Sequence, residues 1–271
     1  MSMTVPIQAH NEKPGAMWSS GGANYDQVSR GIADSIEHCV QRLDPKPGER
    51  ILDLATGTGW TSRLVARRGA TVVGADIAAD LVSAAQERAK AEGLDIEYRI
   101  GDAEKLTFSD GEFDAVISTC GVMFASRPEA AAAEVARVTR KGGRVALTTW
   151  LPDSNLFKMF QVMKPYMPPP PSPAPPSPFE WGKAERVREL LGGSFDLRFE
   201  RGTSFYREPS GEAAWNTFSK SYGPTKALAG SLDETRRTEL RREFGASMLP
   251  TGRRTLNVEP RPSSLSTWIE P

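Results

Sequence analysis

The chain has 271 residues, in which 34 lysine and arginine residues balance 34 aspartate and glutamate residues. This balance gives no net field that would attract a nucleic acid, and no apolar stretch approaches the ~20 residues that a membrane-spanning helix needs. The two cysteines, Cys39 and Cys120, form neither a disulfide framework nor a metal-ligand spacing, which suits a reducing cytosol. The composition predicts a cytoplasmic globular protein with one α/β domain and an appended cap.

The first part of the chain changes character at Tyr25. Residues 1–24 are polar and contain glycine, and we interpret them as a flexible N-terminal arm. They show no basic segment followed by an apolar run, so they do not predict a secretory signal. From Tyr25 onward, apolar side chains recur at the spacing of a helix that Asp44 and Pro45 end.

Short apolar strands and helices alternate over residues 45–150. The strands are predicted at residues 51–55, 71–75, 96–100, 113–119 and 144–150. The helices between them are predicted at residues 61–68, 79–92 and 129–139. Continuous apolar strands separated by helices are typical of a parallel sheet covered on both faces. We therefore expect a doubly wound, Rossmann-like, mostly parallel sheet.

After Trp150 the pattern predicts a small helical cap over about residues 151–250. Its helices are expected at residues 155–166, 181–191, 211–221 and 232–244, with a strand at 195–207. Residues 167–178 are rich in proline, which permits only extended or turn structure, as a stiff linker or as the edge of a lid. Residues 251–271 are expected to be a weakly ordered tail, because residues 259–271 fit a last strand poorly.

A glycine-rich loop follows the first predicted strand. Asp53 lies in that strand, and the loop reads Ala55-Thr56-Gly57-Thr58-Gly59. Glycine lets the backbone turn tightly and lets a ligand approach without an intervening Cβ atom. A dinucleotide-binding loop has a third glycine three positions later, but residue 62 is serine, so that fingerprint fails. An ordinary strand-to-helix turn would also explain such a loop.

The second predicted strand runs into an acidic residue, Asp76, which is followed by Ile77. In a doubly wound sheet this carboxylate would lie at the carboxyl edge, where it can accept hydrogen bonds from both hydroxyls of a ribose. NAD-binding domains share this feature, so Asp76 alone does not distinguish between cofactors. A carboxylate that caps the next helix is the other interpretation.

The third predicted strand leads into Gly101-Asp102-Ala103. The Asp102 carboxylate can accept from the amino group of adenine, and the Ala103 amide can donate to a ring nitrogen. A donor and an acceptor side by side at a strand end would read one edge of the adenine base. This third signal favours an adenosine-containing cofactor other than a dinucleotide.

Taken in order, these motifs resemble those of class I S-adenosylmethionine-dependent methyltransferases. The glycine loop resembles motif I of that family with alanine at its first glycine, and residues 113–119 and 141–145 resemble its fourth strand and the turn into its fifth. Residues 101–106, 121–124 and 181–191 look like the branch related to quinone-biosynthesis C-methyltransferases. The resemblance implies a methyltransferase domain over residues 25–250, with a cofactor-binding core at 45–150, and it fades after about residue 249.

The resemblance implies that the chain is an enzyme that transfers a methyl group from S-adenosylmethionine to an O, N or C nucleophile of a small-molecule acceptor. In the branch that it resembles, the N-terminal segment with Trp18 and Tyr25 folds over the cofactor, which suggests Tyr25 and Arg30 near the methionine carboxylate. The cofactor-binding residues that it implies are Tyr25, Asp53, Ala55, Thr56, Gly57, Gly59, Asp76, Ile77, Asp102, Ala103 and Thr119. We expect no metal, no nucleic acid and no membrane span, and the oligomeric state stays open.

The sequence does not identify a catalytic base. The segments that carry the motifs contain no His–Asp pair and no paired carboxylates, so the rate is expected to come from proximity and alignment. His38 could be a base or only a partly exposed histidine on a helix. Cys120 could lie beside the methionine end of the cofactor, but nothing in the sequence indicates an activated thiol. A catalytically silent cofactor-binding or regulatory protein on the same fold is the main alternative, and an NAD(P)-dependent oxidoreductase is the weaker one.

Overall fold

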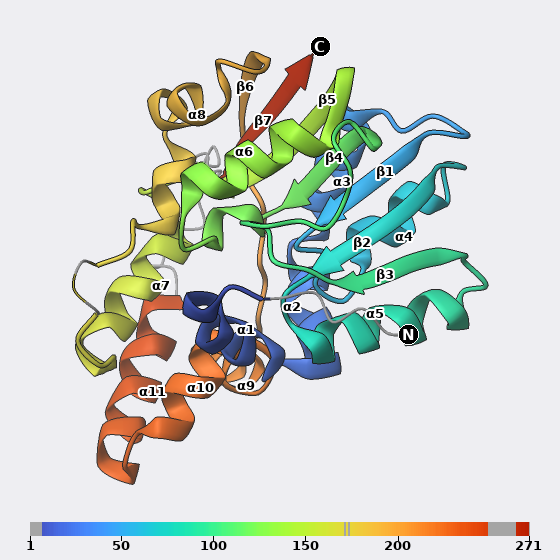
Figure 1. Ribbon diagram of the computed structural model, residues 1–271. Coiled ribbons are helices and arrows are strands. Elements are labelled where there is room, and N and C mark those ends of the chain that lie inside the picture. The colour runs from blue at the N-terminus through green and yellow to red at the C-terminus, as the bar shows by residue number, and fades with distance from the viewer. Residues whose placement is uncertain (1–6, 171, 173, 249–263, 271) are drawn as a thin grey trace, which may run out of the picture.

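A seven-stranded sheet with the order β3-β2-β1-β4-β5-β7-β6 forms the centre of the computed structural model (Figure 1). The structure describes residues 7–170, 172, 174–248 and 264–270. Strands β1 to β5 pair in parallel, and β7 runs antiparallel to both of its neighbours. The strands are β1 (Arg50–Leu54), β2 (Thr71–Asp76), β3 (Ile96–Ile100), β4 (Phe113–Thr119), β5 (Thr139–Trp150), β6 (Asp196–Gly202) and β7 (Ser264–Glu270). The expected doubly wound, mostly parallel sheet is confirmed.

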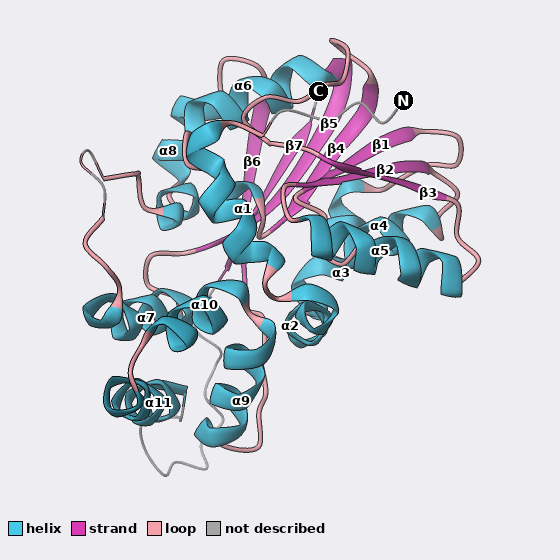
Figure 2. Ribbon diagram, turned by 60° about the horizontal axis from the view of Figure 1, so that its bottom comes forward, coloured by secondary structure: helices cyan, strands magenta, loops and turns pink. Residues whose placement is uncertain are grey.

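Helices cover both faces of this sheet (Figure 2). One face carries α3 (Ala33–Leu43), α4 (Trp60–Ala66) and α5 (Ala79–Ala91), and the other carries α6 (Pro128–Val138) and α8 (Ala184–Leu191). Strand β1 has apolar side chains on both faces: Leu52 and Leu54 pack into the cluster on the α6 face, whereas Ile51 packs into the cluster on the α3 face.

The predicted cap is a separate cluster of helices beside the sheet (Figure 2). It consists of α7 (Asn155–Met163), α9 (Gly211–Ser221), α10 (Gly223–Ser231) and α11 (Glu234–Met248). Buried residues from α7, α9 and α11, including Met159, Trp215 and Phe244, form its core. Helix α10 was not predicted; its Pro224 lies in the first turn, where a helix needs no backbone N–H of that residue.

The N-terminal segment differs from the expected flexible arm. Ala9–Asn11 and Gly22–Tyr25 form 3-10 turns (η1 and η2), and Glu12–Ser19 forms helix α1 between them. Helix α1 contacts α5 and α10, and a Cβ atom on Gly15 would lie 3.1 Å from Ile77 at the end of β2. The segment is ordered by contacts with distant parts of the chain, which its own composition could not indicate. Residues 1–6 of the expected arm lie outside the described residues.

The predicted continuous helix after Tyr25 is divided in two. Helix α2 (Asp26–Gly31) ends at Ile32, whose φ of −118° and ψ of 21° depart from helical values, and α3 begins at Ala33. The ring of Tyr206 lies where a Cβ atom on Gly31 would be, at 2.1 Å. Because residue 31 is glycine, the loop after β6, which contains Tyr206, can pack against the end of α2.

The tail expectation is also corrected. Residues 259–271 were expected to be weakly ordered and to leave the sheet edge incomplete, but Ser264–Glu270 form β7 between β5 and β6. The strand is in register with residues 145–150 of β5 and 196–202 of β6. Backbone pairing on both sides outweighs the poor local strand signal of this segment. Residues 251–263 and 271 of the predicted tail lie outside the described residues.

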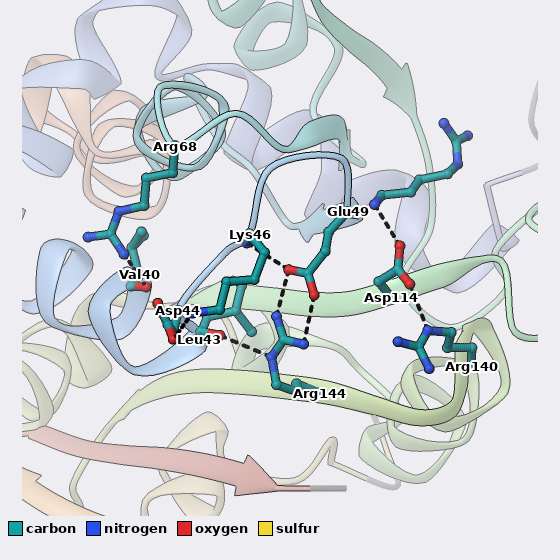
Figure 3. A network of polar contacts seen from close by, with 10 residues as sticks. Val40, Leu43, Asp44, Lys46, Glu49, Arg68, Asp114, Arg140 and Arg144 are labelled. Carbon is teal, nitrogen blue, oxygen red and sulfur yellow. Dashed lines mark hydrogen bonds and ion pairs between the residues drawn. The ribbon is translucent and has the colours of Figure 1, made fainter.

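Ion pairs and hydrogen bonds join neighbouring strands at the amino-terminal edge of the sheet (Figure 3). The Glu49 carboxylate accepts hydrogen bonds of 2.8 and 2.6 Å from the guanidinium of Arg144, and Asp114 accepts from Arg140 at 2.6 Å and from the Arg50 backbone at 2.8 Å. These contacts join the beginnings of β1, β4 and β5. The carboxyl edge, where the strand order reverses between β1 and β4, is left for binding.

Candidate functional site

A cavity opens at the carboxyl ends of β1, β2, β3 and β4 and is covered by α1 and α2. It encloses about 1000 Å³, counted with its open mouth. Nine of the eleven predicted cofactor residues line it: Tyr25, Ala55, Thr56, Gly57, Asp76, Ile77, Asp102, Ala103 and Thr119. Asp53 and Gly59 do not line it. Parallel α/β sheets bind ligands at this reversal point, so the cavity is the candidate functional site.

The glycine loop between β1 and α4 turns through positive φ angles. Ala55, Gly57 and Gly59 have φ values of 57°, 57° and 75°. A Cβ atom on Gly57 would face the ring of Tyr25 at 3.5 Å, so Tyr25 covers the loop from the cavity side. A Cβ atom on Gly59 would lie 2.3 Å from the hydroxyl of Tyr98. Gly57 therefore opens the loop toward the cavity, whereas Gly59 is needed for packing behind it.

Asp53 positions the loop from behind. The side chain is fully buried, and its Oδ2 atom accepts hydrogen bonds from the hydroxyls of Thr56 and Ser62, both at 2.6 Å. Burial raises the pKa of the Asp53 carboxyl to about 6. Ser62 is the residue that departs from the dinucleotide fingerprint, and its hydroxyl fills a structural role here. The predicted cofactor role of Asp53 is therefore indirect, through Thr56.

The raised pKa of Asp53 predicts a pH-dependent stability. Because the folded-state pKa lies above that of an unfolded chain, this carboxyl stabilises the fold most below about pH 4, and its contribution is lost as the pH rises through about 6. An Asp53→Asn variant retains an acceptor for both hydroxyls but does not titrate. From pH 4 to pH 7 we expect the unfolding free energy of wild type to fall by roughly 2–3 kcal/mol relative to that of Asp53→Asn. Urea unfolding of both proteins at several pH values measures it, and parallel pH profiles would contradict it.

Asp76 connects the end of β2 with the glycine loop and with α5. Its Oδ2 atom accepts from the Gly57 backbone at 2.8 Å, and its Oδ1 atom accepts from the Ala78 backbone at 2.9 Å. Burial raises the pKa of this carboxyl. Asp76 thus binds the backbone of Ala78, the residue before α5, and also lines the cavity, whereas α5 has no side-chain cap of the kind that the capping interpretation expected. Each oxygen retains acceptor capacity for a ligand.

The loop after β3 contributes two buried acids, Asp102 and Glu104. Both line the cavity, and residues of the N-terminal segment bind both of them. Asn11 is buried, lines the cavity and donates from its side-chain amide to Asp102 at 3.0 Å. Asn11 and Glu104 were not among the predicted residues; a polar residue before a predicted domain, such as Asn11, gives no signal of the partner it will meet 91 positions later.

Aromatic side chains form the other end of the cavity. Trp18, Tyr25 and Phe124 line it, and the Trp18 and Phe124 ring centroids lie 4.9 Å apart. Tyr222 of the cap stacks on Tyr25 at 6.2 Å with an interplanar angle of 20°. Tyr25 therefore lies over the glycine loop, and Trp18 lies between Tyr25 and Phe124 in the lining. Arg30, suggested beside Tyr25, is exposed and does not line the cavity.

The charges of the cavity are all of one sign. Its charged lining residues are Asp76, Asp102 and Glu104, and no lysine or arginine in the described part of the chain lines it. Arg63 is buried nearby, but its guanidinium donates to the Thr58 carbonyl at 2.7 Å and pairs with Glu92 at 3.0 Å behind the loop. The site therefore favours a cationic or neutral ligand over an anionic one.

The residues considered as bases or nucleophiles do not form a catalytic pair in the cavity. His38 lies 3.4 Å from Glu200 of β6 and is not part of the lining. Cys120 lines the cavity, but burial raises the pKa of its thiol to about 12. Over the described ranges, no cluster of three or more His, Cys, Asp or Glu side chains could bind a metal ion. None of the described helices has the length and apolar character of a membrane-spanning segment.

The fold and the cavity agree with comparisons to known proteins. Residues 52–147 match the family model described as "Methyltransferase domain". The chain belongs to the class I S-adenosylmethionine-dependent methyltransferases. The chain is also similar over 254 residues to the uncharacterized protein Rv1403c of Mycobacterium tuberculosis, with 38% identity and 89% of each chain covered.

Three further proteins are similar to the chain in sequence or in fold. The uncharacterized protein Rv1405c of Mycobacterium tuberculosis is 39% identical over 181 residues, which is 66% of each chain. A demethylmenaquinone methyltransferase of Beutenbergia cavernae is 36% identical over 126 residues, or 45% of this chain and 51% of that protein. The crystal structure of the [4+2]-cyclase SpnF superposes with a TM-score of 0.61 over 98% of both chains at 17% identity, which shows the shared fold alone.

Proposed function

We propose that the chain transfers the methyl group of S-adenosylmethionine to a nucleophilic O, N or C atom of a small molecule. The observation that carries the proposal is the cavity at the strand reversal, with three carboxylates and, in its described lining, no cationic side chain. This lining suits a sulfonium cofactor, whereas the diphosphate of NAD(P) would have no cationic partner there. The oxidoreductase alternative is correspondingly disfavoured.

The residues around the cavity fit the parts of the cofactor. Asp76 has acceptor capacity for the ribose hydroxyls, and Asp102 with the Ala103 amide suits the adenine edge. The open side of the loop at Gly57, under the Tyr25 ring, suits the methionine portion. Ile77 and Thr119 also line the cavity. When bound, S-adenosylmethionine supplies a methyl group on a positively charged sulfur that is ready for direct displacement.

The contribution of the chain is to align the reactants and to exclude water. Burial raises the pKa of the Tyr25 phenol, which therefore stays neutral, and the Cys120 thiol stays protonated at neutral pH. Neither of these two groups is ready to accept a proton, which supports an acceptor that ionises readily by itself. Orientation of two bound reactants can lower a barrier by about 7–11 kcal/mol, which is enough for such an acceptor.

Partners and location form part of the same proposal. The aromatic end of the cavity, with Trp18 and Phe124, suits a small-molecule acceptor, and the balanced net charge argues against a nucleic acid. Cys39 and Cys120 are both free thiols, as a reducing cytoplasm would keep them.

The test of the proposed function is an Asp76→Ala variant in calorimetric titrations with S-adenosylhomocysteine. We expect wild type to bind and Asp76→Ala to lose about 1.5–3 kcal/mol of affinity, the range for hydrogen bonds to a charged group. Asp80→Ala, on the exposed first turn of α5, is the matched control and should bind as wild type does. Equal affinities for wild type and Asp76→Ala would remove Asp76 from the site. Binding without methyl transfer over a broad acceptor panel would favour the silent cofactor-binding alternative instead.

A further inference from the structure

All acceptor positions of the Asp102 carboxylate are taken by the protein itself. Its Oδ2 atom accepts from the Gln8 backbone at 2.9 Å and from the Asn11 side-chain nitrogen at 3.0 Å. Its Oδ1 atom accepts from the same Asn11 nitrogen at 3.1 Å and from the Glu104 backbone at 3.0 Å. A carboxylate offers about four acceptor positions, and Asp102 is 1% exposed, so none is left over for a further donor.

The carboxamide of Asn11 is fixed at both ends. Its oxygen accepts a hydrogen bond of 2.7 Å from the Ser126 hydroxyl, and its nitrogen donates to Asp102. An ionised carboxylate can only accept, so the amide nitrogen and not the oxygen faces it. Asn11 is 4% exposed and belongs to the cavity lining. It therefore stands at the position from which a ligand would approach Asp102.

Glu104 is bound by the same stretch of chain. Its Oε2 atom lies 2.6 Å from Nε2 of His10, and its Oε1 atom accepts from the Arg127 backbone at 2.8 Å. Gln8, His10 and Asn11 thus hold two buried acids of the loop after β3, and we call these three residues the N-terminal clasp. Of these three residues, Gln8 and Asn11 donate to Asp102, whereas His10 contacts Glu104.

We propose that Asn11 is a determinant of cofactor affinity because its amide competes with the adenine amino group for Asp102. The inference rests on the proposed use of this cavity by S-adenosylmethionine, whose adenine needs one acceptor position on that carboxylate. Of the three donors on Asp102, Asn11 is the one that donates from a side chain, and it lines the cavity, so we assign it as the donor that adenine displaces. Cofactor binding therefore includes an exchange of one hydrogen bond for another, which lowers the net affinity.

Removal of the competing amide should tighten binding. Asn11→Leu keeps the approximate volume of the side chain but has no donor, and Asn11→Ala serves as a second variant. Titrated with S-adenosylhomocysteine, both should show a Kd about 2- to 12-fold lower than wild type, the range of one net hydrogen bond. Melting temperatures without ligand confirm that each variant is folded.

Two controls separate competition at Asp102 from a general loosening of the N-terminal segment. His10→Ala releases the contact with Glu104 but leaves Asp102 occupied, so its Kd should stay within about twofold of wild type. S-inosylhomocysteine has a carbonyl in place of the adenine amino group, so position 6 of its base cannot donate to Asp102. Its Kd should not fall when Asn11 is replaced.

The outcomes are distinct. A Kd for S-adenosylhomocysteine that rises in both Asn11 variants would make Asn11 part of the adenine site and overturn the competition. An equal decrease in His10→Ala, or an equal decrease with S-inosylhomocysteine, would overturn it too, because loosening alone would then explain the gain. If wild type binds neither compound, the proposed function fails together with this inference.

Discussion

Replacement of Gly57 by valine is expected to raise the Kd for S-adenosylhomocysteine by more than about 100-fold, equivalent to roughly 2.8 kcal/mol. The φ of Gly57 is 57°, a conformation that costs an L-residue about 1–2 kcal/mol. Its Cβ atom would face the ring of Tyr25 at 3.5 Å, so the branched methyl groups would fill the space between loop and ring. Calorimetry at equal protein concentrations gives the Kd values of wild type and variant.

Gly48→Val is the matched control for backbone strain. Gly48 has a φ of 84° in the turn before β1, outside the cavity lining, and nothing lies within 4 Å of a Cβ atom placed there. Both variants should lower the melting temperature to a similar extent, but only Gly57→Val should lose binding. Gly57→Val that binds as well as Gly48→Val would show that this loop does not face the ligand.

Replacement of Trp181 by alanine should lower the free energy of unfolding by about 3–5 kcal/mol, the usual cost of removing a large buried aromatic side chain. Trp181 is completely buried in the cluster on the α6 face, directly after the proline-rich segment. Its backbone carbonyl accepts from the Thr149 hydroxyl at 3.0 Å, which attaches the returning chain to β5. Urea unfolding measures the loss, and cofactor affinity should not change, because Trp181 does not line the cavity.

Phe205→Ala provides the comparison for an aromatic residue in the same half of the chain. Phe205 is 48% exposed, so its truncation should change stability by less than about 1 kcal/mol. A loss for Trp181→Ala no greater than that for Phe205→Ala would mean that the packing of Trp181 on the α6 face of the sheet contributes little to stability.

The core strands and the helices between them could be predicted because burial on both faces of the sheet requires consecutive apolar residues in the sequence. Leu52 and Ile51 point to opposite faces of β1, yet both have to be apolar, so the run is continuous. The site residues at Asp76 and Asp102 could be predicted for a related reason: parallel strands bring their carboxyl ends to one edge, so residues directly after each strand meet. Their roles toward the cofactor remain proposals.

Partners distant in sequence explain what was not predicted. Asn11 has no periodic or motif signal, because its role depends on Asp102 and Ser126, which are 91 and 115 positions away. Gly59 fits the motif, but its lack of a side chain leaves room for the Tyr98 hydroxyl, a contact that forms only in the folded sheet. Residues 264–270 become a strand because two strands already present offer them backbone partners on both sides.

The position of β7 determines the order in which the sheet can form during synthesis. β7 lies between β5 and β6 in the sheet, although α9, α10 and α11 of the cap are translated after β6 and before β7. During synthesis, β5 and β6 therefore present open edges that β7 will later occupy, and open strand edges are sites of aggregation. The nascent chain can complete the parallel part around β1 early, but the other half of the sheet can close only after release of residues 264–270. Premature termination ahead of β7 would consequently leave a chain with a formed cofactor edge and a persistent tendency to associate through β5 and β6.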